Sequence, residues 1–279
     1  MKIAIASGKG GTGKTSLAIS LLLANADRAR LLDCDVEEPN CHLFLPVTIL
    51  EHSSVELPIP HVEASLCKLC EKCVRACQFN AMAMAGKAGV IVFEELCHSC
   101  GACARICPQG AIHESLVKIG EVAQSRCTNG AELVTGTLVI GHSSASAVIK
   151  AVRKTSAIQD VPFTLIDAPP GTACTFVAAV NGSDFVLLVT EATPFGLNDL
   201  KLAIEALQNM KLPFAIIVNR IQSESNLITD YAAKQGFPVW MQIPESRHVA
   251  ETYARGGTLL DAMPELAQPL RELLDRCTQ

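Results

Sequence analysis

The sequence predicts an α/β protein with a doubly wound, mostly parallel sheet, into which a small cysteine-rich α+β domain is inserted. Three observations support this fold class. A glycine-rich phosphate-loop motif lies between a short apolar strand and a helix near the start of the chain. Later apolar runs end in acidic or turn-forming residues, as strands of an open parallel sheet do. Eight cysteines fall in two runs of identical spacing between these elements. We therefore predict a discontinuous main domain, residues 1–60 and 120–279, and an inserted domain, residues 61–119.

Length and composition favour one large and one small folded domain. Of 279 residues, 49% are hydrophobic and 18% are charged, which excludes global disorder. The net charge of −5 argues against nucleic acid as a partner. No apolar run approaches the roughly 18 residues of a membrane span, and Met1 leads directly into a strand, so we expect neither stable membrane insertion nor a signal peptide. Thirteen cysteines without such a signal favour the reducing cytoplasm.

The phosphate-loop motif occupies residues 7–15 and follows the apolar residues 3–6. Its glycines allow tight turns that aim backbone N–H groups at a phosphate, where the dipole of the helix at 14–23 adds positive potential. The motif predicts that Lys14 reaches the β- and γ-phosphates and that the Thr15 hydroxyl binds Mg²⁺. A glycine-rich turn without a ligand is the alternative. The predicted nucleotide-binding residues of this segment are Gly8, Lys9, Gly10, Gly11, Thr12, Gly13, Lys14, Thr15 and Ser16.

A second lysine, Lys9, lies inside the loop and is not required by an ordinary phosphate loop. With it, residues 1–45 and about 130–260 resemble the deviant-Walker P-loop ATPases, which include the MinD/ParA family, the Mrp-type iron–sulfur carriers and the nitrogenase iron protein. The resemblance implies a doubly wound P-loop NTPase that binds ATP or ADP with Mg²⁺. It also implies a nucleotide-dependent homodimer in which Lys9 crosses the interface to the phosphates bound by the second subunit.

Acidic residues end two of the predicted strands. Asp33 and Asp35 follow one apolar run, and Asp167 ends another. Ligands bind at this edge of an open parallel sheet, although an aspartate there can also cap a turn. The resemblance implies that Asp35, with Asp33 second, orients the attacking water or contacts the Mg²⁺ shell, that Asp167 binds Mg²⁺ through water, and that residues 168–172 form a γ-phosphate-dependent switch. The predicted catalytic residues are Lys9, Lys14, Asp35 and Asp167, and the predicted Mg²⁺ site comprises Thr15, Asp33, Asp35 and Asp167.

Two further strand ends supply candidates for binding the adenine base. One run ends in Asn219 and Arg220, and another ends in Pro244 and Glu245. In the resembling families an asparagine at this place reads the adenine edge, whereas the alternative is an asparagine that serves a turn. Pro244 and Glu245 are predicted to line the base pocket through backbone groups.

The two cysteine runs share the spacing C-x2-C-x2-C-x3-C and form an internal duplication. They resemble two-cluster bacterial ferredoxins, in which each run supplies three thiolates to one cluster and its fourth to the other. Gln78 replaces the proline expected after the first run, whereas Pro108 follows the second. A four-thiolate zinc site or disulfides are the competing interpretations. The resemblance implies two [4Fe–4S] clusters, one held by Cys67, Cys70, Cys73 and Cys107 and the other by Cys77, Cys97, Cys100 and Cys103.

The remaining predictions concern secondary structure and one further cysteine. Residues 46–62 contain three prolines and are predicted as a connection with a short edge strand at 55–59. Cys174 follows the predicted switch at residues 168–172, where the nitrogenase iron protein has a cluster ligand. We identify no matching second cysteine, so we expect Cys174 to be a buried cysteine in apolar surroundings. The other predictions are a hairpin from 81–85 and 90–93, strands within 117–142, and helices at 143–157, 246–255 and 264–276, the last packed on the core through leucines.

Together, the two resemblances imply an ATP-binding iron–sulfur protein, a slow Mg²⁺-dependent ATPase whose nucleotide state gates electron transfer through two clusters to a partner protein. Catalysis would depend mostly on positioning and charge neutralisation. One alternative is a carrier ATPase that assembles clusters or metallocofactors. Another is a ParA-like positioning ATPase with structural clusters. The expected partner is a redox or metallocofactor protein.

Overall fold

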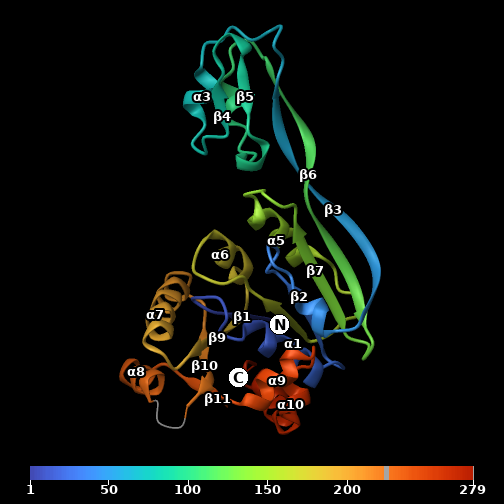
Figure 1. Cartoon of the computed structure of the whole chain (residues 1–279), viewed down its shortest axis with the longest axis vertical. Helices are drawn as coiled ribbons and strands as arrows, with labels where there is room; N and C mark the ends of the chain where they lie inside the picture. The colour runs from blue at the N-terminus through green and yellow to red at the C-terminus, as the bar shows by residue number, and fades with distance from the viewer. Residues whose placement is uncertain (223–225, 279) are drawn as a thin grey trace.

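A computed structural model describes residues 1–222 and 226–278. Most of its strands are β1 Lys2–Ala6, β2 Ala29–Asp33, β3 Val47–Val62, β6 Ile112–Cys127, β7 Glu132–Leu138, β8 Phe163–Asp167, β9 Phe185–Glu191, β10 Phe214–Ile221 and β11 Val239–Pro244. They form one nine-stranded sheet in the order β11-β10-β9-β1-β8-β2-β7-β6-β3 (Figure 1). Neighbours from β11 to β7 are parallel, and β7–β6 and β6–β3 are antiparallel. The predicted α/β class with a mostly parallel sheet is confirmed.

Helices cover both faces of the parallel part of the sheet. We call these strands together with their helices the body. Ile3 and Ile5 of β1 pack with the helices of one face, and Ala4 and Ala6 pack with those of the other. This two-sided burial explains why the central strands are apolar throughout. One face carries α1 Lys14–Ala24, α2 Cys41–Phe44, α9 Arg247–Ala254, α10 Leu259–Ala262 and α11 Ala267–Arg276, and the other carries α5 Ala145–Lys154, α6 Cys174–Val180, α7 Pro194–Asn209 and α8 Leu227–Gln235.

The predicted helices at 143–157, 246–255 and 264–276 correspond to α5, α9 and α11, the last preceded by a short 3₁₀ turn, η3 Pro264–Leu266. Leu270, Leu273 and Leu274 of α11 are buried against α1, so the leucine stripe packs on the core as predicted. Within the described ranges, no helix is long and apolar enough to cross a membrane.

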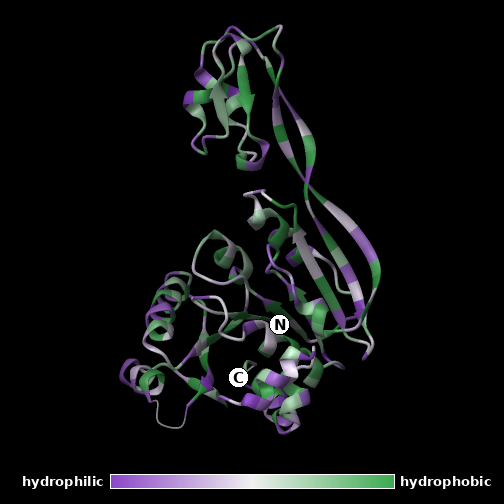
Figure 2. Ribbon diagram, viewed as in Figure 1, coloured by the Kyte–Doolittle hydropathy of each residue, from purple (hydrophilic) through white to green (hydrophobic). Residues whose placement is uncertain are grey.

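The short edge strand predicted at 55–59 is present, but the prediction of a connection for the rest of 46–62 was wrong. Residues 47–62 form one 16-residue edge strand, β3. It pairs along its whole length with β6, from Val47 opposite Cys127 to Val62 opposite Ile112. Pro58 and Pro60 are tolerated because β3 is the edge strand of the sheet. Figure 2 shows why the pattern was weak: polar and apolar residues alternate irregularly along this hairpin, and most residues of β3 are exposed. We call the β3–β6 hairpin the arm.

The arm carries a small lobe, residues 63–111, at its far end from the sheet (Figure 1). The predicted hairpin is present as β4 Met82–Met84 and β5 Val90–Val92. The lobe also contains α3 Lys72–Ala76, η1 Gly86–Ala88, η2 Glu94–Leu96 and α4 Ala102–Ile106. Its backbone repeats: left-handed φ angles recur 30 residues apart, at 69 and 99, 71 and 101, and 80 and 110. The duplication seen in the cysteine spacing is therefore also a duplication of chain geometry.

Candidate functional site

The phosphate loop connects β1 to α1, as its motif predicts. Gly11 and Gly13 have left-handed φ angles of 76° and 90°, which side chains rarely adopt. Gly8 has no such angle, but a Cβ there would collide with the backbone of Asp199 in α7. Lys14, at the first position of α1, is 6% exposed. The loop is thus shaped by close approach and by left-handed turns, and it directs a lysine into the base of the site.

The two strand-end aspartates meet beside this loop. β8 lies between β1 and β2, so Asp167 is in register with Ile5 on one side and Asp33 on the other. The Thr15 hydroxyl donates a 2.6 Å hydrogen bond to Oδ2 of Asp167. Oδ1 of the same carboxylate is buried and has no hydrogen-bond partner. A buried carboxylate oxygen without a partner, next to a threonine hydroxyl, fits the oxygen ligands that Mg²⁺ requires.

Burial also changes the acidity of these groups. Desolvation, followed by the charge of Asp33, raises the pKa of Asp167 to about 7. Desolvation raises the pKa of Asp33 to about 6. The pKa of Asp35 is also raised to about 6 by burial, although the charge of Lys14 opposes the shift. The raised pKa values mean that ionising these buried carboxylates costs free energy. A bound cation would lower that cost by stabilising the charged form.

Asp33 and Asp35 have different surroundings. The carboxylate of Asp33 is fully buried and accepts backbone N–H groups from Asp35 at 3.2 Å, Asn40 at 3.2 Å and Cys41 at 3.1 Å. Asp33 therefore organises the loop after β2. This is the turn-capping role that we gave above as the alternative for an aspartate at a strand end. Asp35 is only partly buried beside Lys14, where its carboxylate can approach a nucleotide.

Cys41 is a site residue that the motif analysis missed. Its fully buried Sγ lies 3.7 Å from Oδ2 of Asp167. Among the described residues, Asp33, Cys41 and Asp167 are the group whose possible metal-ligand atoms all lie within 4.8 Å of one another. Burial and the neighbouring carboxylates raise the pKa of the Cys41 thiol well above its usual range. No spacing rule connects this cysteine with the phosphate loop, so only the fold could have found it.

Lys9 is held by its own chain in this structure. Its ammonium lies 3.1 Å from the carboxylate of Glu191, which also pairs with Arg220 at 2.8 Å. The Lys9 side chain remains 31% exposed at the mouth of the loop. Its predicted role across a dimer interface stays a prediction.

The predicted base-binding residues line one cavity next to α1. This cavity of about 300 Å³ is bordered by Asn219, Arg220, Pro244 and Glu245 together with Gly13, Ser16 and Tyr253. The Asn219 side chain donates to the Thr12 carbonyl at 2.8 Å, so it also braces the phosphate loop. Tyr253 of α9 was not predicted; its hydroxyl accepts a 2.6 Å hydrogen bond from Ser16. The cavity has the position and lining expected of a site for a flat base.

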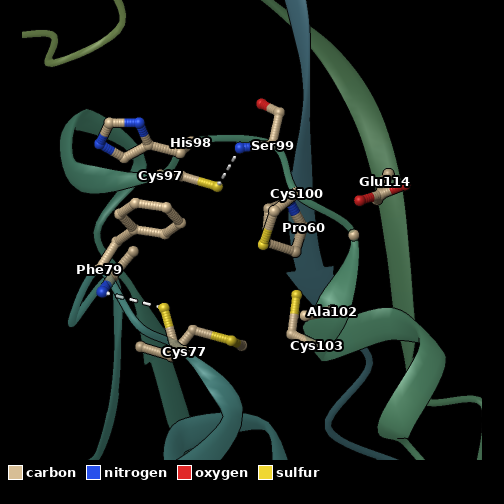
Figure 3. A pocket seen from close by; sticks show the side chains of 13 residues that line it. Pro60, Cys77, Phe79, Cys97, His98, Ser99, Cys100, Ala102, Cys103 and Glu114 are labelled. Carbon is tan, nitrogen blue, oxygen red and sulfur yellow. Dashed lines mark hydrogen bonds between the residues drawn. The ribbon is translucent and has the colours of Figure 1, made fainter. Parts of the chain in front are cut away.

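The eight lobe cysteines separate into two groups of four, which we call the proximal and distal quartets. The proximal quartet, Cys77, Cys97, Cys100 and Cys103, lines one cavity, where the sulfurs of the labelled residues point toward a common space (Figure 3). The distal quartet, Cys67, Cys70, Cys73 and Cys107, lines another. Each group combines three cysteines of one run with the fourth of the other, the crossed grouping stated above. All eight are free cysteines in this structure.

The sulfur positions bear on what the quartets can bind. A tetrahedral zinc ion with bonds of about 2.3 Å would hold its sulfurs about 3.8 Å apart. Yet among the described residues neither quartet has three sulfurs within 4.8 Å of one another. Backbone N–H groups of Ala81, Ser99 and Ala111 point at cysteine sulfurs over 3.3–3.4 Å, an arrangement that stabilises thiolates. Each quartet is therefore a candidate site for a metal group with four sulfur ligands.

Cys174 corrects a prediction, because it is exposed rather than buried. It begins α6 and borders a large cleft between body and lobe. Among the described residues no second cysteine joins it in a metal-binding group.

Comparisons with known proteins agree with the phosphate-binding half of this picture. A family model described as "CobQ/CobB/MinD/ParA nucleotide binding domain" matches residues 3–259. Two uncharacterized proteins of Methanocaldococcus jannaschii are similar to this chain. MJ0579 is 28% identical over 93% of this chain and 91% of its own length. MJ0578 is 29% identical over 99% of this chain and 96% of its own length.

Solved structures show the same fold at lower identity. A chain of the MinC:MinD cell division complex of Aquifex aeolicus has a TM-score of 0.59 at 17% identity, covering 99% of this chain and 96% of that one. MinD complexed with Mg-ADP from Pyrococcus horikoshii has a TM-score of 0.56 at 20% identity, covering 99% and 98%.

Proposed function

Because the chain belongs to the CobQ/CobB/MinD/ParA family of nucleotide-binding domains, we propose that it is a Mg²⁺-dependent ATPase whose nucleotide state gates electron transfer through two [4Fe–4S] clusters. One observation carries the proposal. A single chain joins a phosphate loop with a paired Thr15 and Asp167 to two separate cysteine quartets on a projecting arm. The first part handles phosphate, and the second part suits one-electron chemistry.

The ATPase half of the proposal rests on the groups around Lys14. Its ammonium would neutralise charge on the β- and γ-phosphates, with the backbone N–H groups of the loop. Thr15 and Asp167 would hold Mg²⁺, which would neutralise further phosphate charge when bound. Asp35 is the partly buried acid beside Lys14, and we assign it the orientation of the attacking water. MinD of Pyrococcus horikoshii, which has the same fold, is complexed with Mg-ADP, and this supports the proposal that the chain binds an adenine nucleotide with Mg²⁺.

The electron-transfer half rests on the quartets. Four cysteines line each cavity, and backbone N–H groups point at three of the eight sulfurs, as expected of cubane iron–sulfur ligation. A bound cluster would supply one-electron transfer. The protein supplies the thiolates, the N–H groups and an apolar surround that includes Met82, Ile112 and Ile59.

We further propose that ATP closes a homodimer. Lys9 would exchange its ion pair with Glu191 for contact with the second subunit's phosphates. Glu191 would keep its 2.8 Å ion pair with Arg220, so the release of Lys9 would not leave this mostly buried carboxylate without a cationic partner. Analytical ultracentrifugation with ATP, ADP and Lys9→Ala tests this step, and a monomer with ATP would refute it.

The decisive experiment measures oxidation of reduced, anoxically purified protein by an artificial acceptor and by candidate partner proteins. We expect partner-dependent oxidation to be faster with ATP than with ADP, and this difference to vanish in Lys14→Ala. Lys234→Ala, an exposed lysine of α8, is the matched control. Equal rates with ATP, ADP and Lys14→Ala would rule out gating. Transfer of labelled iron to an acceptor protein would instead favour a carrier function.

A further inference from the structure

The two quartets share one backbone design but have different neighbours. Residues 62–112 alone line the distal cavity. The proximal quartet, in contrast, touches the body. The buried hydroxyl of Ser144 donates a 3.2 Å hydrogen bond to the carbonyl oxygen of Cys97, and the N–H of Ser143 donates to Glu95 at 2.9 Å. Both serines lie at the start of α5, so α5 meets the segment that carries one ligand of the proximal quartet.

Helix α5 in turn contacts α6, the helix that follows the predicted switch at residues 168–172. It packs against α6, and the Arg153 guanidinium of α5 donates to the carbonyls of Ala179 and Asn181 at the end of α6. The turn that precedes α6 contains Gly171, whose N–H donates to the Ser7 carbonyl of the phosphate loop at 3.2 Å. A continuous series of packed elements therefore runs from the phosphate loop through α6 and α5 to Cys97.

Elsewhere the lobe and the body are separated. A cleft of about 820 Å³ lies between them, bordered by Phe79 and His98 of the lobe, Lys150 of α5 and Cys174 of α6. Phe79 and His98 stack at 4.0 Å over the opening of the proximal cavity (Figure 3). The cleft separates the lobe from α5 on this side. A shift of α5 can therefore reach the lobe by two routes, directly through the contacts of Ser143 and Ser144 or indirectly through the arm.

We propose that Ser144 is the positioning residue through which the nucleotide state reaches the lobe, and that the proximal quartet alone responds to it. The inference rests on the proposed function, since it needs ATP to move the predicted switch at residues 168–172. A change at the Ser144–Cys97 hydrogen bond alters the orientation of Cys97 and the N–H of Ser99, which points at the Cys97 sulfur over 3.4 Å. Hydrogen bonds to ligand sulfurs tune cluster potential, so the distal quartet keeps one potential while the proximal one is switched.

Amide hydrogen exchange on anoxically purified protein tests the proposal, with ADP compared to a non-hydrolysable ATP analogue. We expect exchange in peptide 95–101 to differ about fivefold between the nucleotides, the factor for one hydrogen bond. Peptide 65–71, its equivalent 30 residues earlier, is the internal control and should not change. Ser144→Ala should abolish the difference, Ser144→Thr should restore it, and Ser146→Ala on the same helix should leave it intact. In a redox titration, the potential of one cluster should shift between nucleotides and the other should not.

The outcomes separate this inference from the function beneath it. Protection of phosphate-loop peptide 8–16 without any response of peptide 95–101 would overturn the relay while leaving nucleotide binding in place. Equal responses of both lobe peptides, or a response that survives in folded Ser144→Ala, would also overturn it. If the phosphate-loop peptide gained no protection from either nucleotide, the proposed ATPase and the relay would both fail. Melting curves of each variant establish that it is folded.

Discussion

The body and the lobe are stabilised in different ways. The body buries aliphatic side chains on both faces of its sheet, in two extended clusters that include Leu17, Ile166 and Leu188. The lobe has two small clusters, and the cysteines themselves are members of both. A segment of this size buries too little apolar surface to fold firmly by itself. The body can therefore fold by burial alone, whereas the lobe depends on what its sulfurs bind.

Removing iron should break this comparison most visibly. When a chelator strips the anoxic protein, amides of residues 63–111 should exchange roughly 100-fold faster or more, because metal binding supplies much of the folding free energy of such modules. Peptides from β8 and β9 serve as the control and should stay protected. A lobe that keeps its protection without iron would show that its fold does not need the clusters.

The next effect concerns the body alone. Asp167→Asn removes a proposed Mg²⁺ ligand and should slow ATP hydrolysis by about 10²–10³-fold, the range for losing one group that stabilises transition-state charge. Iron content should not change, because the eight thiols proposed to hold iron lie in the lobe and Asp167 is not among them. Asp230→Asn, on exposed α8, is the matched control. Loss of iron together with activity would show that holding iron in the lobe depends on an intact phosphate site in the body.

A smaller effect is the pH dependence of the body. The pKa of Asp167 is about 7 in the folded chain and near 3.8 when unfolded. Between these values the folded state holds a proton that the unfolded state has released, so the stability of nucleotide-free protein should fall as pH rises from about 4 to about 7. Differential scanning calorimetry without added magnesium should show a decrease in Tm of at least about 2 °C. Asp167→Asn should reduce the slope, most clearly between about pH 6 and 7, because the pKa values of Asp33 and Asp35 are also raised, to about 6, and these groups contribute at lower pH. An unchanged slope in that variant would assign the effect to other groups.

The smallest effect is the pattern of cysteine alkylation near neutral pH. Cys174 is exposed and should react in the iron-loaded protein. Burial raises the pKa of Cys127 to about 11 and that of Cys277 to about 12, so both should stay unmodified. After iron removal the lobe cysteines should become reactive as well, which mass spectrometry of tryptic peptides would show. Rapid labelling of Cys127 in folded protein would contradict the burial described for it.

Local patterns made much of the site predictable. The phosphate loop and the spacing within each cysteine run depend on residues within short distances along the chain, where glycine conformations and fixed spacings constrain the geometry directly. The crossed grouping joins distant cysteines and was implied by the ferredoxin resemblance. The full length of the arm was missed because β3 contains prolines and polar residues. In addition, its pairing partner β6 begins at Ile112, 50 residues after β3 ends at Val62. Cys41 and Tyr253 were missed because each joins the site only through tertiary packing.

The sequence by itself determined the strand–loop–helix position of the phosphate-loop motif and the duplication of the cysteine spacing, because the backbone conformations involved are local and are repeated in the two halves of the lobe. The crossed grouping of the cysteines was implied by the ferredoxin resemblance. Only the tertiary structure decided that Asp167 keeps one oxygen without a partner, that Asn219 braces the loop at Thr12, and that α5 meets Cys97 rather than Cys67. Those outcomes depend on which distant segments the sheet and the arm bring together, and side-chain burial sets that arrangement for the molecule as a whole.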